Sequence, residues 1–272
     1  MKFNIIFPMA GKGSRFGYKF KPFLKISDLT FIQLAFQPFL NYKKYINKVY
    51  FIITNEQNKE FLVQENLKKQ FSSISYELIT LDKDTSGPIE TLSTAIINNN
   101  LDGSSFICDC DHSINIDEII NLLEKNHDLD IIIPTYNLDE EDAMAWSKVY
   151  ENDGNLINFS EKETLDEGDK IMGMIGCYYF KNIDYFKNLD NNFENMSEIF
   201  KVLLNQTEKI NIVTSEISKA EFFGDPKRLQ DCINKRRNKK CVFCDIDGTL
   251  VYHKANPNYL SQDTILLNKT LA

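Results

Sequence analysis

The sequence lacks a long hydrophobic run. None of its apolar stretches approaches the roughly 18 consecutive apolar residues that a membrane-spanning helix requires, and we therefore expect no membrane span. The run near the amino terminus covers only Phe3–Phe7 before Pro8, and glycines and charged residues follow at once. This pattern is unlike a secretory signal, so we expect a cytoplasmic protein.

The sequence also lacks an excess of positive charge. Lys and Arg number 31 against 39 Asp and Glu, which gives a formal net charge of −8 over 272 residues. An acidic chain of this kind is unsuited to nucleic acid as its main partner, and the basic run Lys235–Lys240 is typical of a solvated linker. Phosphorylated small molecules remain compatible with the composition, because a few local cations are enough to bind them.

Cysteine is sparse for a chain of this length, and its six residues do not form a disulfide framework. Cys241 and Cys244 have CxxC spacing, but they lie in the apolar run CVFC. In a strand, this spacing points the two side chains to opposite faces, which suits neither a shared metal nor a redox pair. We expect all six to be reduced thiols, packed as small apolar side chains.

The first half of the chain alternates two kinds of segment. Short runs that are almost continuously apolar are typical of strands buried on both faces of a parallel sheet. The predicted strands are Phe3–Phe7, Lys48–Thr54, Ser75–Leu81, Ser104–Cys108 and Asp130–Tyr136. Between them lie segments with apolar residues at helical spacing: Thr30–Tyr42, Gln57–Gln70, Pro88–Asn99 and Ile116–Asn126. This alternation predicts an α/β fold with a doubly wound, mostly parallel sheet.

From about Trp146 the pattern changes to a small, mixed β region. The predicted strands here are Trp146–Glu151, Leu156–Glu161 and Ile171–Phe180, and a turn at Asn152–Asn155 joins the first two. Two helices, a strand and a last helix follow, near Asn182–Leu189, Ser197–Leu204, Lys209–Val213 and Asp225–Arg237. We expect Trp146 and the Tyr178–Phe180 cluster to belong to the core.

A glycine-rich loop, Gly11–Arg15, directly follows the first predicted strand. Ligands of open α/β sheets bind at such carboxyl ends of strands. Two common phosphate-binding patterns nevertheless fail, because GxGxxG would need glycine in place of Phe16 and a P-loop would need glycine in place of Ile6.

What remains is a loop with the chemistry of a phosphate cradle. Gly11, Gly13 and Ser14 let backbone N–H groups converge on phosphate oxygens. Arg15 can hold a phosphate with two parallel hydrogen bonds, and Lys21 can act as a mobile point charge.

GKGSRF followed by FKPFL, after an apolar strand, resembles the signature of the sugar-phosphate nucleotidyltransferases, which have a Rossmann-like fold. These enzymes join a nucleoside triphosphate to a sugar phosphate and release pyrophosphate. The resemblance implies that Gly11, Gly13, Ser14 and Arg15 wrap the triphosphate and that Lys21 neutralises the departing pyrophosphate.

Later motifs extend this resemblance in the same order along the chain. Thr85–Pro88 resembles the segment that contacts the nucleotide base, mainly through Gly87. Asp111, in the segment Asp109–His112, resembles the aspartate that binds Mg²⁺. The pair Glu161–Lys162 resembles the one whose lysine grips the acceptor phosphate, and Gly176 resembles the glycine that faces the sugar.

One element departs from the pattern of that family. Many members carry a second metal-binding aspartate two residues before a turn, and the corresponding residue here is Phe222. Asp225 or Glu221 can substitute for it, or Mg²⁺ can rely on Asp111, phosphates and water. The sequence leaves these alternatives open.

A second motif lies near the end of the sequence. An apolar strand runs into Asp245–Thr249, which resembles the first motif of haloacid-dehalogenase-like phosphatases. The resemblance implies that Asp245 is the nucleophile and Asp247 the acid and base. Only 23 residues follow Thr249, and the later motifs of that fold are missing, so we expect no phosphatase activity. The preferred explanation is a fragment of a longer bifunctional protein.

These observations divide the chain into residues 1–235, a nucleotidyltransferase domain, then 236–240, a basic linker, then 241–272, the first piece of a phosphatase-like domain. The function expected is a bacterial, Mg²⁺-dependent nucleotidyltransferase that joins an NTP to a sugar phosphate or polyol phosphate for capsule or other surface polysaccharide. CTP is favoured by analogy with capsule-type enzymes. The alternatives are a glycosyltransferase with Asp109 and Asp111 as its DxD metal motif, and a non-catalytic nucleotide-sensing domain.

Overall fold

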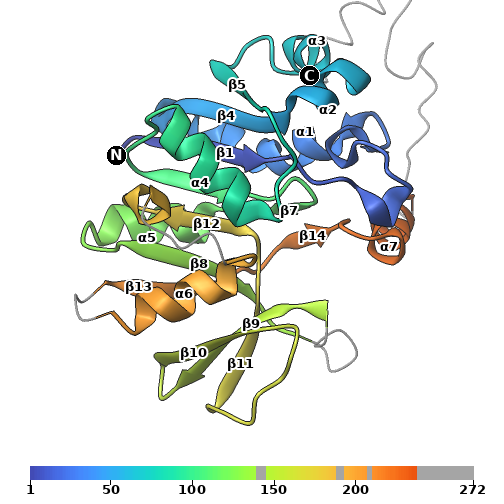
Figure 1. Ribbon diagram of the computed structural model, residues 1–272. Coiled ribbons are helices and arrows are strands. Elements are labelled where there is room, and N and C mark those ends of the chain that lie inside the picture. The colour runs from blue at the N-terminus through green and yellow to red at the C-terminus, as the bar shows by residue number, and fades with distance from the viewer. Residues whose placement is uncertain (139–144, 188–192, 207–209, 238–272) are drawn as a thin grey trace, which may run out of the picture. The chain divides into compact units, whose positions relative to one another are not determined.

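A large mixed sheet forms the centre of the computed structural model (Figure 1). The structure describes residues 1–138, 145–187, 193–206 and 210–237. Met1–Ile233 form one compact unit, and Asn234–Ala272 group separately from it. The predicted phosphatase motif at Asp245 and Asp247 therefore lies outside the described residues, as do Cys241 and Cys244.

One half of the sheet is parallel, with the strand order β6-β1-β4-β5. In the other half, β12 runs antiparallel between β6 and β8, and β13 pairs parallel with β8. Strands β11, β9 and β10 continue the sheet as an antiparallel extension, seen at the bottom of Figure 1. The bounds are β1 Phe3–Pro8, β4 Ile46–Thr54, β5 Tyr76–Leu81, β6 Ser105–Cys108, β8 Ile131–Tyr136, β9 Ser147–Asn152, β10 Asn155–Glu161, β11 Lys170–Met174, β12 Cys177–Phe180 and β13 Ile212–Glu216.

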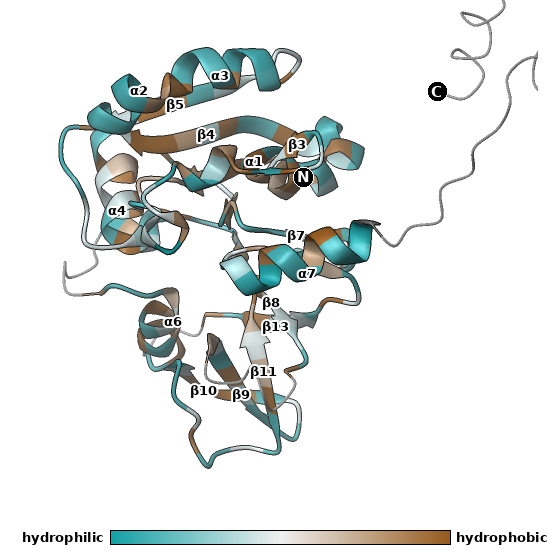
Figure 2. Ribbon diagram, turned by 90° about the vertical axis from the view of Figure 1, so that its right-hand side faces the viewer, coloured by the Kyte–Doolittle hydropathy of each residue, from teal (hydrophilic) through white to brown (hydrophobic). Residues whose placement is uncertain are grey.

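Helices cover both faces of this sheet, which confirms the predicted α/β fold class. Alternate residues of each parallel strand enter different core clusters, as Ile5 and Ile6 of β1 do. Helices α1, α3 and α5 pack on the Ile5 face, and α4 and α6 pack on the Ile6 face. Figure 2 shows the exposed sides of α2 and α3 as hydrophilic. The bounds are α1 Phe31–Phe36, α2 Asn55–Phe61, α3 Val63–Gln70, α4 Pro88–Asn98, α5 Asp117–Lys125, α6 Met196–Leu204 and α7 Pro226–Arg237.

Short elements complete the described part of the chain. The two-residue strands β2 and β3 pair with each other, and β7 pairs with β14. The described residues also include four 3₁₀ segments. The strands are β2 Lys25–Ile26, β3 Leu29–Thr30, β7 His112–Ile114 and β14 Ala220–Phe222, and the 3₁₀ segments are Ser14–Phe16, Lys21–Phe23, Gln37–Tyr45 and Asp184–Lys187.

The expected single strand Ile171–Phe180 is wrong. The chain forms two strands, β11 and β12, and it breaks between them at Ile175–Gly176. At the break, the N–H of Asp109 donates to the carbonyl of Gly176 at 2.6 Å, and Ile175 donates to Pro134. The apolar pattern runs through the break without interruption, so hydrophobicity alone does not reveal it.

Several expected helices also differ from those observed. The segment Thr30–Tyr42 is α-helical only to Phe36, and a 3₁₀ segment with Pro38 near its start follows. The segment Gln57–Gln70 splits at Leu62, which has a φ of 48°. The expected strand Lys209–Val213 is displaced to β13, whose pairing with β8 sets its position.

Two further expectations can be compared with the structure. Cys108, Cys110, Cys177 and Cys232 are buried free thiols, as predicted. Within residues 1–138, 145–187, 193–206 and 210–237, no helix is long and apolar enough to cross a membrane.

Candidate active site

A pocket of about 680 Å³ lies where β1 and β6 end. Three segments that are far apart in the sequence line it: the glycine-rich loop, the start of α4, and the segment after β6. The carboxyl ends of parallel strands meet at one edge of a sheet, which explains why these loops converge there. The predicted site residues in the lining are Gly11, Gly13, Ser14, Arg15, Lys21, Gly87 and Asp111.

The glycine-rich loop turns sharply at Gly13. This residue has a φ of 65°, and a Cβ on it would lie 2.2 Å from the backbone oxygen of Lys19. The Gly13 carbonyl accepts hydrogen bonds from the N–H groups of Phe16 and Tyr18, which closes the turn. A larger residue at this position would therefore open the loop that faces the pocket.

Three cationic side chains line this pocket, and one of them, Lys12, pairs with Asp84 at 2.9 Å. Lys21 forms an ion pair with Asp111, with 2.9 Å between Nζ and Oδ2. Burial works against the charge on Lys21, but Asp111 outweighs it and holds the pKa of the amine above its usual value. No ion pair of Arg15 is found among the described residues, and its side chain is exposed. Arg15 is thus available to an anion in the pocket.

Asp109, Asp111 and His112 form an acidic group at the pocket floor, with donor atoms within 4.8 Å of one another. Burial and the neighbouring charge of Asp111 raise the pKa of Asp109 to about 6. Burial opposes ionisation of Asp111, but Lys21 and His112 hold its pKa below the usual range. Hydrogen bonds to Asp111 and Cys177 overcome burial and raise the pKa of His112 to about 10.

Two glycines bring the backbone close to these carboxylates. A Cβ on Gly176 would lie 2.1 Å from Oδ2 of Asp109, and a Cβ on Gly224 would lie 2.4 Å from Oδ2 of Asp111. The two carboxylates are therefore confined between backbone segments and converge on one volume. Carboxylate oxygens are the ligands that Mg²⁺ prefers, so the donor set fits a hard divalent cation.

The amino terminus of α4 forms the opposite wall. Gly87 is its N-cap, Pro88 its first residue, and a Cβ on Gly87 would lie 3.0 Å from the Glu194 carbonyl oxygen. Ser86 donates its N–H to Glu90, and the hydroxyls of Thr85 and Thr91 are 2.6 Å apart. These contacts hold the segment that is expected to face a nucleotide base.

A second pocket, of about 160 Å³, adjoins the first and shares Arg15, Asp109, Asp111 and Gly224 with it. The predicted acceptor residue Gly176 lines this smaller pocket. Because Arg15 lines both pockets, one guanidinium can contact ligands in each.

Sequence reasoning missed two residues of the smaller pocket, Trp146 and Arg228. Arg228 lies over the Trp146 ring at 5.0 Å and forms an ion pair with Asp225 at 3.2 Å. Nε1 of Trp146 is buried, and none of the described residues forms a hydrogen bond with it. Trp146 was expected in the core. Arg228 belongs to no motif that the sequence shows, and its position in a helix that begins at Pro226, after the end of a strand, is the signal that could have indicated a role.

Glu161 and Lys162 line neither pocket. Glu161 accepts hydrogen bonds from Ser147 and Ser197 at 2.5 and 3.0 Å, and Ser147 belongs to the smaller pocket. Lys162 is half exposed and pairs with Glu161 at 3.4 Å. Its φ of 60° is rare for a residue with a side chain, so the turn after β10 is held in a strained conformation.

Asp225, one of the alternatives for a second metal ligand, caps a helix in the structure. Asp225 accepts the N–H of Arg228 at 2.9 Å and pairs with its guanidinium, which is the arrangement of a helix cap. It is not part of the acidic group of Asp109, Asp111 and His112. Phe222, in the position where the second aspartate was sought, stacks edge-on against Trp146 with ring centroids 4.7 Å apart.

The chain was compared with known proteins by family, by sequence and by structure. No family model matches it, and no curated protein matches it by sequence. Solved structures do match. A protein from Bacillus anthracis, described as a glucose-1-phosphate thymidylyltransferase, has a TM-score of 0.70 at 15% identity, covering 89% of this chain and 98% of that one.

Two other structures are similar to the same extent. The nucleoside-diphosphate-sugar pyrophosphorylase from Vibrio cholerae has a TM-score of 0.65 at 16% identity, covering 85% of this chain and 99% of that one. The inositol-1-phosphate CTP transferase from T. maritima has a TM-score of 0.67 at 9% identity, covering 89% and 98%. The chain therefore has the fold of the sugar-phosphate nucleotidyltransferases.

Proposed function

We propose that the protein is a divalent-metal-dependent nucleotidyltransferase that joins an NTP to a phosphorylated sugar or sugar alcohol. The observation that carries this proposal is the convergence of Gly11–Arg15, Lys21 and Asp109–Asp111 on one pocket. In this proposal, these residues supply a phosphate cradle, a leaving-group cation and a metal-binding carboxylate around the same space. The shared fold of the three enzymes named above supports the same activity.

The larger pocket receives the nucleoside triphosphate in this proposal. The glycine-rich loop binds the phosphates through backbone N–H groups and Arg15. The base lies against Gly87 at the start of α4, where a larger residue would approach the Glu194 carbonyl. Lys21, charged and beside Asp111, neutralises the negative charge that collects on the departing pyrophosphate.

The acceptor occupies the smaller pocket, beside Gly176. An oxygen of its phosphate attacks the α-phosphorus as the bond to the β-phosphate breaks, and pyrophosphate leaves. Catalysis then depends on holding two polyanions in line, so positioning and charge neutralisation dominate. Arg15, which lines both pockets, can contact both reacting phosphates.

Asp111 and Asp109 would hold the divalent cation, with His112 fixing the orientation of Asp111. Bound there, Mg²⁺ would polarise the α-phosphoryl group and offset its charge. Asp225 stays a weaker candidate for the second ligand, because its carboxylate caps α7.

The substrates are assigned by analogy. We favour CTP, because one enzyme of the same fold is an inositol-1-phosphate CTP transferase, whose acceptor is a phosphorylated polyol. The product would be an activated precursor for bacterial capsule or another surface polysaccharide, made in the cytoplasm.

Pyrophosphate release tests the proposal. The protein is incubated with each NTP, Mg²⁺ and a panel of sugar and polyol phosphates. Release that requires both substrates supports the transferase. Nucleotide binding without release across the panel would favour a nucleotide-sensing domain, and consumption of a nucleotide-sugar donor in a parallel assay would favour a glycosyltransferase.

Arg228 lines the smaller pocket, so in this proposal it binds the acceptor phosphate together with Arg15, and a pair of variants tests this role against the one predicted for Lys162. Arg228→Leu should raise the KM for the acceptor roughly tenfold or more while leaving the KM for the NTP unchanged, since a charge-assisted hydrogen bond contributes about 1.5–3 kcal/mol. Lys162→Met is the matched comparison, because Lys162 lies outside both pockets. If the KM for the acceptor rises only in Lys162→Met, Arg228 does not bind the acceptor phosphate, and the role first predicted for Lys162 is restored.

A further inference from the structure

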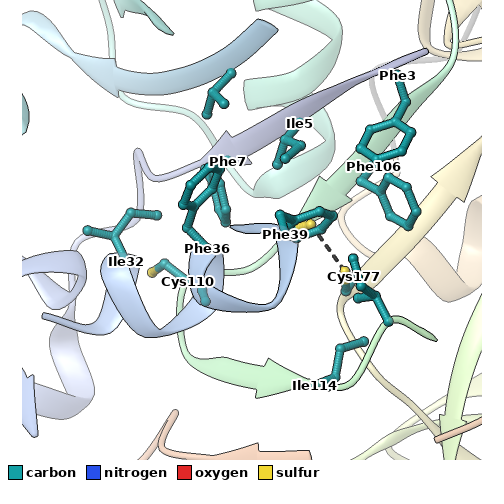
Figure 3. Close-up of a cluster of buried hydrophobic side chains, with 14 of the residues drawn as sticks. Phe3, Ile5, Phe7, Ile32, Phe36, Phe39, Phe106, Cys110, Ile114 and Cys177 are labelled. Atoms are coloured by element: carbon teal, nitrogen blue, oxygen red, sulfur yellow. Dashed lines mark hydrogen bonds between the residues drawn. The ribbon is translucent and has the colours of Figure 1, made fainter. Parts of the chain in front are cut away.

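Two cysteines lie in direct contact beneath the acidic group. Cys108 on β6 and Cys177 on β12 are register partners on adjacent antiparallel strands, and their sulfurs are 3.2 Å apart. The dashed line at Cys177 in Figure 3 marks this contact, among buried aromatic and aliphatic side chains. Each residue is 2% exposed, and both are free thiols.

The pair is connected to the acidic group through His112. Its Nδ1 lies 3.4 Å from Oδ1 of Asp111, and interaction with the Cys177 thiol is one of the causes that raise the pKa of its ring. A continuous series of contacts therefore leads from Cys108 through Cys177 and His112 to Asp111. Buried thiols that only filled space would not need this polar connection.

The backbone makes a second connection. Gly176 directly precedes Cys177, and its carbonyl accepts the N–H of Asp109, the residue that directly follows Cys108. A Cβ on Gly176 would lie 2.1 Å from the Asp109 carboxylate, so the backbone at Gly176 and this carboxylate are tightly packed. Any relative movement of the two cysteines is consequently transmitted to Asp109.

We propose that Cys108 and Cys177 are a peroxide-sensitive dithiol whose oxidation to a disulfide weakens cation binding at Asp109 and Asp111. The sulfur of Cys177 attacks hydrogen peroxide, the O–O bond breaks, and water leaves with a sulfenic acid formed on Cys177. The sulfur of Cys108 then attacks the sulfenic sulfur, the S–S bond forms, and a second water departs. Two thiols and one peroxide thus give one disulfide and two waters.

The geometric consequence follows from the length of the bond. A disulfide is about 2.05 Å long, so the sulfurs must approach by roughly 1 Å and draw β6 and β12 together at Gly176. Cys177 also loses its thiol proton, which changes its hydrogen bond with His112. Because partners that orient metal ligands contribute about 10–100-fold to affinity, we expect a loss of that order.

The test uses the full chain with Cys241 and Cys244 replaced by Ser, so that they contribute no thiols. The protein is treated with hydrogen peroxide, quenched with catalase and digested with trypsin. We expect a mass loss of two hydrogens and a cross-link between peptides Asp84–Lys125 and Ile171–Lys181. The cross-link should persist in Cys110→Ser, vanish in Cys108→Ala and Cys177→Ala, and leave Cys232 reduced.

Binding of Mn²⁺, followed by electron paramagnetic resonance, gives the second readout. We expect at least about tenfold weaker Mn²⁺ binding after oxidation and recovery after reduction with dithiothreitol. This comparison of oxidised and reduced protein needs no substitution at Cys108 or Cys177. Absence of the cross-link, or a cross-link with unchanged Mn²⁺ affinity, would overturn the proposal. If the reduced protein binds no Mn²⁺, both the redox proposal and the proposed metal site are overturned. If oxidation weakens Mn²⁺ binding but the protein releases no pyrophosphate, only the proposed transferase activity is rejected.

Discussion

Two glycines set how closely the backbone approaches the carboxylates of the acidic group. Gly176 was predicted from its motif, but the reason for it is visible only in the structure. It stands at the break between β11 and β12, where Asp109 fills the space that a side chain would occupy. Gly224 does the same for Asp111; the sequence indicated it only as the start of the turn Gly224–Pro226, without a role beside Asp111.

Gly176→Ala should lower Mn²⁺ affinity by about tenfold or more, because the added methyl group displaces the Asp109 carboxylate. Isothermal titration calorimetry measures the effect, and circular dichroism checks folding. Gly103→Ala is the control: with a φ of 79°, the substitution strains the backbone and should cost about 1 kcal/mol of stability, but Mn²⁺ affinity should not change. Equal affinity in Gly176→Ala and the unmodified protein would contradict this role of Gly176.

Residue identity alone was sufficient to predict the pocket lining contributed by the glycine-rich loop, but insufficient for the smaller pocket, where the acceptor is proposed to bind. Gly13, Arg15 and Lys21 follow a strand in a recognisable order, and the structure places all three around one pocket. Trp146 and Arg228 come from a loop and a late helix, and their contact depends on how α7 packs. Such long-range contacts leave no local pattern in one sequence.

At the scale of elements, local backbone conformation sets where helices and strands end, and hydrophobic periodicity does not predict these ends. The turn expected at Asn152–Asn155 is observed between β9 and β10, with positive φ at Asp153 and Gly154. The helix expected over Gln57–Gln70 breaks at Leu62 although its apolar spacing continues. The left-handed conformation is costly for residues other than glycine, so sequence rules do not predict that a helix ends at a leucine.

Leu62→Gly should therefore stabilise the protein. The left-handed conformation costs a non-glycine residue about 1–2 kcal/mol, which exceeds the entropic disadvantage of glycine, and Leu62 is 53% exposed and gives up little burial. Differential scanning calorimetry should show a rise in Tm of about 1–3 °C. Ile97→Gly, at a similarly exposed site within α4, should lower Tm instead. A lower Tm in both variants would show that Leu62 contributes more through packing than its backbone costs.

At the scale of the whole molecule, the doubly wound sheet was predictable because its strands are apolar on both faces. Residues such as Ile5 and Ile6 enter opposite cores, and that arrangement needs helices on each side. The antiparallel insertion of β12 between β6 and β8 was not predictable. Strand order is decided by contacts between distant segments, which a periodic pattern does not encode.

The unit Met1–Ile233 contains every described residue of the candidate active site. A chain that ends at Arg237 should accordingly retain nucleotidyl transfer within about twofold, and the full chain should not hydrolyse phosphomonoesters. Steady-state kinetics on both chains, with a generic phosphatase substrate as a second assay, measures this. Mg²⁺-dependent hydrolysis that is abolished by Asp245→Asn would show instead that residues 241–272 form a working phosphatase site.

The fate of individual phosphates tests the central claim most directly. CTP labelled with ³²P at either the α or the γ position is incubated with Mg²⁺ and the panel of sugar and polyol phosphates. If the pocket catalyses nucleotidyl transfer, the α label enters a product that resists phosphatase, the γ label leaves as pyrophosphate, and both signals disappear in Asp111→Asn. Release of the γ label as orthophosphate, or an α label that never joins an acceptor with any NTP, would contradict the account.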